Sequence, residues 1–203
     1  MKRNLTEISK ELNRQSGFEG KASVIFITDR HAQPYPENIV SELPVGSMVI
    51  MRDYDDENRA ELGRALGYIC KARNLKFIVA GDYTLCLMLE ADGIHLPETM
   101  MDQARDIRDE RPDYFITAAA HDEKAIKKAT ELGIDALLVG PVFPTKSHPE
   151  TFNDPDSVIG PERFKKICHK YQIPIYALGG VNSQSINEIT NSGAAGIAAI
   201  RGL

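Results

Sequence analysis

One loop of this chain contains four polar residues and follows, in the sequence, a strand that is expected to be buried. They are Thr145, Lys146, Ser147 and His148. They belong to the segment GPVFPTKSHP, residues 140–149, which follows the apolar run 136–139. Because proline has no N–H to donate, the strand must end at the Gly-Pro pair. The four side chains are therefore expected at a rigid strand end, where binding and catalytic groups are often placed.

A second strand end carries a glycine pair. The apolar run 175–178 is followed by Gly179 and Gly180. Glycine has no Cβ, so the backbone N–H groups of such a pair can approach an anion closely. A tight turn with no ligand is the alternative interpretation of this pair.

Eight short apolar runs could position these loops. None shows strong alternation, which is typical of parallel strands buried on both faces. The runs are 24–27, 48–51, 77–80, 92–96, 114–118, 136–139, 175–178 and 195–200. Helical patterns are expected at 4–15, 37–43, 57–73, 83–89, 99–109, 122–132, 161–171 and 183–192. Strands alternating with helices predict an α/β fold, a compact (β/α)₈ TIM barrel with an extra N-terminal helix.

An open, doubly wound sheet is the alternative fold. The number of strands and the absence of a GxGxxG motif argue against it. The chain ends at Leu203, just after the last predicted strand, so we expect a truncated C-terminus without a final helix. The N-terminal helix 4–15 could cover the side left open, or a partner subunit could do so in a homodimer.

Composition narrows the class of protein. With 203 residues, 42% of them hydrophobic, residues 1–203 are expected to form a single domain with a sizeable core. The net charge of −5 argues against nonspecific nucleic-acid binding, which needs a basic surface. No apolar run reaches the roughly eighteen residues of a membrane span. The three cysteines have no disulfide-like spacing, so a reducing, cytoplasmic location is expected.

Polar residues follow most of the predicted strands. In a TIM barrel the strand ends meet on one face, which holds the active site. The residues expected there are Asp29, Arg30, His31, Arg52, Asp82, His95, His121, Lys146, His148 and Arg201.

Three segments of the chain resemble the thiamine phosphate synthase superfamily, which includes the thiazole tautomerases. ADGIHL at 91–96 is similar to the family's GADGVHLGQ, and GPVFPT at 140–145 is similar to its GPIFPT. ALGGVN at 177–182, with GAAGIA at 193–198, is similar to the family's ending. The resemblance implies the family's barrel and its synthase reaction. That reaction joins a hydroxymethylpyrimidine diphosphate to a thiazole phosphate, releasing pyrophosphate, with Mg²⁺ on the diphosphate.

On the diphosphate side the chain departs from the family pattern. The family's Q-x-R-x-K corresponds to residues 50–54, where Arg52 alone is kept. Asp82 is kept as the candidate Mg²⁺ ligand, but the second carboxylate falls at Met100, which has no oxygen to offer. The family's phosphate-loop serine after strand five falls at Ala119 or Ala120.

On the other side of the site the resemblance implies a thiazole-phosphate pocket. Gly179 and Gly180, with the backbone near Ala199 and Ile200, would form the barrel's usual phosphate site after strands seven and eight. Arg201 stands where the family has a serine and could bind the phosphate in a bidentate fashion. The lysine that ends the family's PTxTK falls at His148, with Lys146 two residues away. Thr145, Lys146, Ser147 and His148 would close over the substrate.

Two further functions stay open beside the synthase. The first is a metal-independent isomerisation of a thiazole phosphate, with His121 or His148 as the proton shuttle. The tautomerases place a histidine where this chain has Pro141. The second is a noncatalytic protein that binds a phosphorylated thiazole or pyrimidine ligand.

For three of the candidate site residues, a purely structural role is the alternative to a role in binding or catalysis. Asp82 could cap the helix that begins at Tyr83. Arg52 could form an ion pair with Asp53 or Asp55 instead of binding a ligand. His95 lies between two apolar residues and could be a hydrogen-bonded core histidine.

Overall fold

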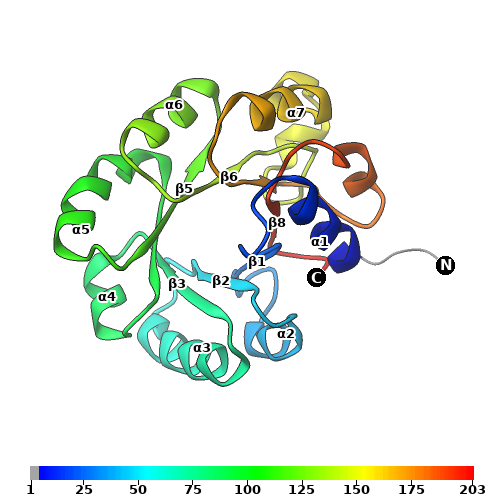
Figure 1. Ribbon diagram of the computed structural model, residues 1–203. Helices are drawn as coiled ribbons and strands as arrows, with labels where there is room; N and C mark the ends of the chain where they lie inside the picture. Colours follow the sequence, from blue (N-terminus) through cyan, green and yellow to red (C-terminus); the bar gives the residue numbers. More distant parts are fainter. Residues whose placement is uncertain (1–4) are drawn as a thin grey trace.

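Eight parallel strands close into a barrel in the computed structural model, which describes residues 5–203 apart from the side chain of Pro155 (Figure 1). The strands are β1 Val24–Ile27, β2 Met48–Met51, β3 Lys76–Ala80, β4 Gly93–Leu96, β5 Phe115–Ala120, β6 Ala136–Val139, β7 Ile175–Leu178 and β8 Gly196–Ala199. Each strand pairs with its neighbours in chain order, and β8 pairs with β1. The predicted (β/α)₈ barrel is confirmed, and the open sheet is excluded because no strand in the barrel has a free edge.

Helices surround the strands as the alternation predicts. They are α1 Leu5–Gln15, α2 Pro36–Glu42, α3 Arg59–Arg73, α4 Tyr83–Met88, α5 Ala104–Glu110, α6 Glu123–Glu131 and α7 Pro161–Lys170. Four 3₁₀ segments accompany them: η1 Glu98–Gln103, η2 Pro149–Phe152, η3 Pro155–Ser157 and η4 Ser185–Ile189.

Two predicted helices were wrong in type or length. The segment 99–109 divides into η1 and α5. The segment 183–192 is only η4, whose buried residues Ile186 and Ile189 are three apart, the repeat of a 3₁₀ turn. Asn191 follows in the left-handed region at φ 60°, which prevents the segment from continuing as a helix.

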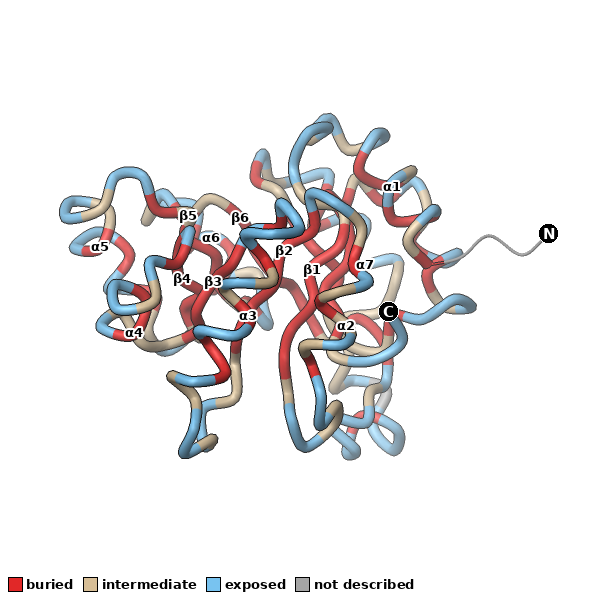
Figure 2. Tube along the Cα trace, turned by 90° about the horizontal axis from the view of Figure 1, so that it is seen from below, coloured by how far each residue is buried: buried red, intermediate tan, exposed pale blue. Residues whose placement is uncertain are grey.

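The core has two layers, one on each face of the barrel sheet. In β1, Val24 and Phe26 pack outward against the helices, whereas Ile25 and Ile27 point into the barrel. This alternation follows from the period of two in a strand. Figure 2 shows the strands as the buried centre and the exposed residues on the helices and loops around them.

α1 covers the barrel beside β8 and β1, as Figure 1 shows. Leu5, Ile8 and Leu12 are its buried apolar residues, in agreement with the predicted face. Asn13 Nδ2 donates a hydrogen bond of 2.7 Å to the carbonyl oxygen of Ala195, and Ser9 Oγ donates to the carbonyl of Ser23. The expectation that the N-terminal helix covers this side is thus confirmed; residue 4, which it included, lies outside the described residues.

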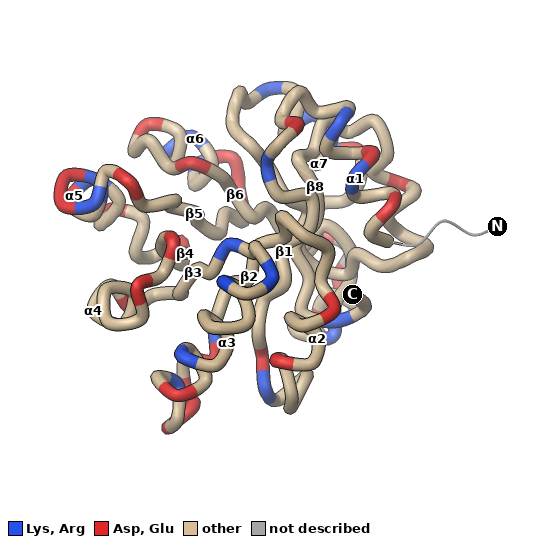
Figure 3. The backbone as a smooth tube through the Cα atoms, turned by 60° about the horizontal axis from the view of Figure 1, so that its bottom comes forward, with Lys and Arg blue, Asp and Glu red and all other residues tan. Residues whose placement is uncertain are grey.

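None of the helices within residues 5–203 has the length and apolar character needed to cross a membrane. Acidic and basic residues are interspersed over the outer helices and loops, as Figure 3 shows.

Candidate functional site

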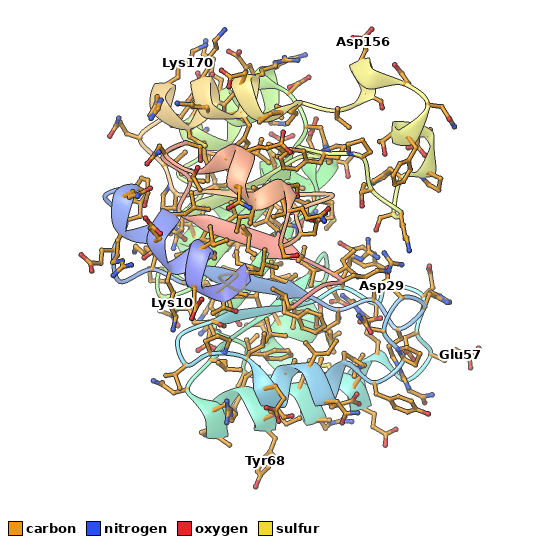
Figure 4. All side chains as sticks on the ribbon, turned by 90° about the vertical axis from the view of Figure 1, so that its right-hand side faces the viewer. Lys10, Asp29, Glu57, Tyr68, Asp156 and Lys170 are labelled. Carbon is orange, nitrogen blue, oxygen red and sulfur yellow. The ribbon has the colours of Figure 1, made fainter. Side chains whose placement is uncertain are left out.

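A cavity of about 570 Å³ opens at the carboxyl ends of the barrel strands. Twelve of the residues that the sequence predicted for the site line it. They are Arg52, His95, His121, Thr145, Lys146, Ser147, His148, Gly179, Gly180, Ala199, Ile200 and Arg201. Figure 4 shows this end of the barrel at the right, where the labelled Asp29 lies, with Lys10 of α1 toward the other end. Parallel strands bring these residues together because all their carboxyl ends share one face.

The glycine pair is required by close packing of two loops. Gly179 and Gly180 have φ values of +86° and +67°. A Cβ on Gly180 would lie 2.4 Å from the carbonyl oxygen of Pro144, and one on Gly179 would lie 2.7 Å from Pro141 Cβ. The carbonyl of Gly180 accepts hydrogen bonds from Ser185 Oγ at 2.9 Å and Asn182 Nδ2 at 3.2 Å, which fix the orientation of this loop.

Backbone donors at the ends of β7 and β8 remain available for a ligand. Within residues 5–203, the N–H groups of Gly180, Ile200 and Arg201 donate no hydrogen bond. All three residues line the cavity. Unpaired backbone donors at a wet strand end suit an anion such as a phosphate.

The loop after β6 holds its four polar residues in a tight turn. The N–H of His148 donates to the carbonyl of Thr145 at 3.0 Å, and Thr151 Oγ1 donates to the carbonyl of His148 at 2.6 Å. His148 is exposed, with Nδ1 3.2 Å from a carboxylate oxygen of Glu150. Arg201 Nη1 donates to Ser147 Oγ at 3.3 Å, which joins the segment after β8 to this loop.

His121 lies at the end of β5 with one ring nitrogen fixed. Its Nδ1 is 2.6 Å from the carbonyl oxygen of Gly140, and its backbone N–H donates to Glu98 Oε2 at 3.1 Å. A carbonyl oxygen can only accept, so Nδ1 carries the proton. In the neutral ring Nε2 then keeps a lone pair, on a side chain that lines the cavity. The helix cap beside it is supplied by Asp122, which accepts from the N–H of Ala125 at 2.8 Å.

His95 is a core residue that also touches the cavity. It is 8% exposed, and its Nδ1 lies 2.9 Å from Thr117 Oγ1. Burial, with the nearby Arg52 cation, lowers the pKa of His95 to about 4. The ring is therefore neutral at physiological pH, and the structural interpretation of His95 as a hydrogen-bonded core histidine is confirmed.

Arg52 is engaged by a carboxylate, though not by either carboxylate that the sequence suggested. Its Nη2 pairs with Asp29, at the end of β1, and not with Asp53 or Asp55. The carboxylate of Asp53 instead accepts from Thr28 Oγ1 and from the N–H of Arg30. The positive charge of Arg52 is thus largely neutralised from behind the cavity wall.

The cavity lining is positive and contains no carboxylate. Arg52, Lys146 and Arg201 line it, and no Asp or Glu does. Of these, Arg52 is paired with Asp29, whereas Lys146 and Arg201 have no ion pair within residues 5–203. An anionic ligand fits such a lining, whereas Mg²⁺ needs oxygen ligands.

The predicted metal ligand Asp82 lies outside the cavity lining, as do Asp29, Arg30 and His31, which were expected on the same face of the barrel. The Oδ1 of Asp82 accepts from the N–H of Leu85 at 2.8 Å, so it caps α4, and Oδ2 lies 3.6 Å from Arg59 Nη1. Met100, at the position of the family's second carboxylate, packs against the hydrophobic core. Within residues 5–203 no group of three or more His, Cys, Asp or Glu side chains could hold a metal ion.

Two aromatic residues of the lining were not predicted. Tyr54 follows β2 and is 48% exposed, and Phe152 of η2 is 60% exposed. Tyr54 could have been found from its place two residues after Arg52 at a strand end. Phe152 lies far along a loop that has no periodic pattern, so no sequence signal indicated it.

Solved structures of other proteins share the fold. 2-Keto-3-deoxy-6-phosphogluconate aldolase of Zymomonas mobilis superposes with a TM-score of 0.63 at 10% identity, covering 97% of this chain and 86% of that one. At such low identity the likeness shows the barrel alone.

Other relatives are similar in sequence as well as in fold. A thiamine phosphate pyrophosphorylase from Pyrococcus furiosus superposes with a TM-score of 0.74 at 26% identity, covering 95% of this chain and 87% of that one. A putative thiamine-phosphate synthase 2 of Aquifex aeolicus is 31% identical over 179 residues, 86% of this chain and 93% of the relative. The thiamine-phosphate synthase of Archaeoglobus fulgidus is 32% identical over 189 residues, 91% and 87% of the two chains.

The sequence profile of one family, described as thiamine monophosphate synthase, matches residues 24–203, which span β1 to the end of the chain. The matched region includes every strand of the barrel and all the residues that line the cavity. The chain therefore belongs to the thiamine monophosphate synthase family.

Proposed function

We propose that the protein binds a phosphorylated thiazole in the barrel mouth and moves a proton on it without a metal. The phosphate would accept hydrogen bonds from the free N–H groups of Gly180, Ile200 and Arg201. The side chains of Lys146 and Arg201 would add positive charge at the same mouth. Family membership supports the ligand class, since family substrates are phosphorylated thiazoles and pyrimidines.

The single observation that carries the proton transfer is the fixed ring of His121. With Nδ1–H held on the carbonyl of Gly140 at 2.6 Å, only Nε2 can take up a proton. Isomerisation would break one C–H bond of the ligand and form another, with Nε2 first accepting and then returning the proton. No atom is gained or lost in the sum of the two steps.

The other histidines of the lining are less suited to this role. His95 is neutral, nearly buried and hydrogen-bonded to Thr117. His148 is exposed to solvent, and Nδ1 lies beside Glu150, in a loop anchored chiefly by its own hydrogen bonds. His121 combines a defined tautomer with a place in the cavity lining.

The synthase reaction is the second candidate, because relatives at about 30% identity are named for it. That reaction would join a hydroxymethylpyrimidine diphosphate to a thiazole phosphate and release pyrophosphate. Mg²⁺ would neutralise the leaving diphosphate, but the residues present do not fit that ion. Asp82 is occupied as a helix cap, Met100 offers no oxygen, and no carboxylate lines the cavity.

The test compares the two reactions in one protein. The first arm follows hydrogen–deuterium exchange at the carbon-bound positions of 4-methyl-5-(2-phosphooxyethyl)thiazole by NMR, with EDTA present. We expect exchange faster than in protein-free buffer, lowered about 10²- to 10⁴-fold in His121→Gln. His31→Gln is the matched control, because His31 is an exposed histidine at the same end of the barrel that does not line the cavity.

The second arm adds hydroxymethylpyrimidine diphosphate, with and without Mg²⁺. Formation of thiamine phosphate, with no exchange in the first arm, would favour the synthase and refute the metal-independent isomerisation. Binding of the thiazole phosphate with neither exchange nor coupling would identify a noncatalytic binding protein.

A further inference from the structure

Tyr54 occupies the half of the cavity where the family resemblance expects diphosphate. It follows β2, on the part of the mouth formed by β1 to β3. The residue is 48% exposed and lines the same cavity as Gly180 and Arg201. The structure therefore presents an aromatic ring, and not an additional cation, at this wall.

The ring of Tyr54 is held from behind by the backbone at Gly81. Gly81 has a φ of +67°, and a Cβ built on it would lie 2.9 Å from Tyr54 Cε1. One part of the ring thus rests directly on the turn that follows β3, where a larger side chain has no room.

Arg59 supports the same ring through its guanidinium group. Its Cζ lies 5.3 Å from the centre of the Tyr54 ring, within the range of a cation–π contact. Arg59 is itself fixed, because Nη2 donates to the carbonyl of Ala80 and Nη1 lies 3.6 Å from the carboxylate of Asp82. Its side chain is only 12% exposed, so the guanidinium belongs to the wall behind Tyr54 and not to the cavity.

The chemistry left at this wall favours a neutral flat group. Burial raises the pKa of Tyr54, which keeps the phenol uncharged at physiological pH. Arg52 is paired with Asp29, and Arg59 with Asp82, so both nearby cations already have a carboxylate. A diphosphate would find little net positive charge here, whereas a planar ring would find a fixed aromatic surface.

We infer that Tyr54 is a specificity-determining residue that stacks against the uncharged aromatic ring of a monophosphate ester. The chemical class is an aromatic heterocycle carrying one phosphate, with the phosphate at the β7–β8 end and the ring at the β2–β3 wall. This inference rests on the phosphate site of the proposed function and adds to it the part of the ligand that the opposite wall recognises.

The experiment uses two phosphate esters that differ in the ring alone. Affinities of 2-phenylethyl phosphate and ethyl phosphate are measured by calorimetry for the full-length protein and its variants. We expect the wild type to bind the phenyl ester about tenfold more tightly, in keeping with the strength of aromatic stacking. Tyr54→Ala should remove this preference and leave ethyl phosphate binding unchanged, whereas Tyr54→Phe should keep it.

Two further variants test whether a loss of preference comes from poor folding or from the removal of any tyrosine. Tyr54→Leu replaces the ring by an apolar group of smaller but comparable bulk, and should lose the preference even if the alanine variant folds poorly. Tyr68→Ala removes a tyrosine that is 78% exposed on the outer helix α3, and should keep the preference. In NMR spectra, the phenyl protons of the bound ester should shift upfield with wild type and Tyr54→Phe alone.

The outcomes separate the two proposals. If both esters bind and Tyr54→Ala or Tyr54→Leu leaves their ratio unchanged, the role of Tyr54 is refuted while the phosphate site stands. If neither ester binds to the wild type, the phosphate site fails and the inference about Tyr54 fails with it.

Discussion

Replacement of His95 by glutamine is expected to change the acid stability of the barrel. In the folded protein, burial lowers the pKa of His95 to about 4, against about 6.5 for an ordinary histidine. The unfolded chain therefore binds more protons than the folded chain between these two values. Stability is lost as the pH falls through this window and is regained as it rises, because the folded barrel holds the neutral ring.

The size of the effect follows from the shift. A difference of roughly 2.5 pKa units corresponds to a loss of about 3 kcal/mol in unfolding free energy once the pH is below both pKa values. Between about pH 7 and pH 4.5 the wild type should lose about 2 kcal/mol of unfolding free energy on account of this one residue. His95→Gln has no titrating ring, so it should lose that much less over the same interval.

Urea unfolding at the two pH values measures the effect for wild type, His95→Gln and the control His31→Gln. Wild type and His95→Gln have the same carboxylates, so the difference between their pH dependences isolates the histidine at position 95. Glutamine can still hydrogen-bond to Thr117, which limits the loss of stability at neutral pH. If wild type and His95→Gln lose the same free energy on acidification, the argument that His95 is buried in its neutral form is wrong.

Two further predictions concern the glycine pair and Asp82. Gly180→Ala should lose binding of inorganic phosphate and at least 2 kcal/mol of stability, because its Cβ would meet the Pro144 carbonyl at 2.4 Å in a left-handed backbone. Gly133→Ala is the control, because Gly133 has a φ of +70° and a Cβ there would meet nothing within 4 Å; it should lose about 1 kcal/mol of stability and keep phosphate binding. If calorimetry and urea unfolding show the same losses of phosphate affinity and of stability in both variants, this reasoning is wrong. Asp82→Asn should keep stability and ligand affinity because asparagine caps helices as well as aspartate does, whereas Asp82→Ala should lose about 1 kcal/mol. A loss of Mg²⁺-dependent activity in Asp82→Asn would show instead that Asp82 is a metal ligand.

The strands could be predicted from the sequence because each is a short apolar run between strong boundaries. β6 ends at Gly140-Pro141, β7 ends at the glycine pair, and the predicted bounds of both agree with the structure. The helices before β6 and β7 were likewise predicted to within a residue or two. The segment 183–192 failed because its two buried isoleucines fit a helix pattern as well as a 3₁₀ turn.

The face of the site also followed from sequence, because parallel strands in a barrel bring every carboxyl end to one mouth. That rule placed Arg52, His121, Lys146, Gly180 and Arg201 together, and the structure agrees. That rule could not say which of these groups already form hydrogen bonds or ion pairs with other residues of the protein. For Asp82 the family resemblance implied a metal ligand and its place before Tyr83 suggested a helix cap, and the hydrogen bond from the N–H of Leu85 shows that it caps the helix.

What the sequence alone determined is the barrel, the family resemblance and the end of the barrel that carries the site. These depend on local runs of residue types and on the rule that the parallel strands of a barrel end on one face. The pairing of Arg52 with Asp29, the tautomer of His121 set by Gly140, and the support of Tyr54 by Gly81 and Arg59 were decided by tertiary structure. Each joins residues on different strands or loops, and only the closed barrel brings their atoms within contact distance.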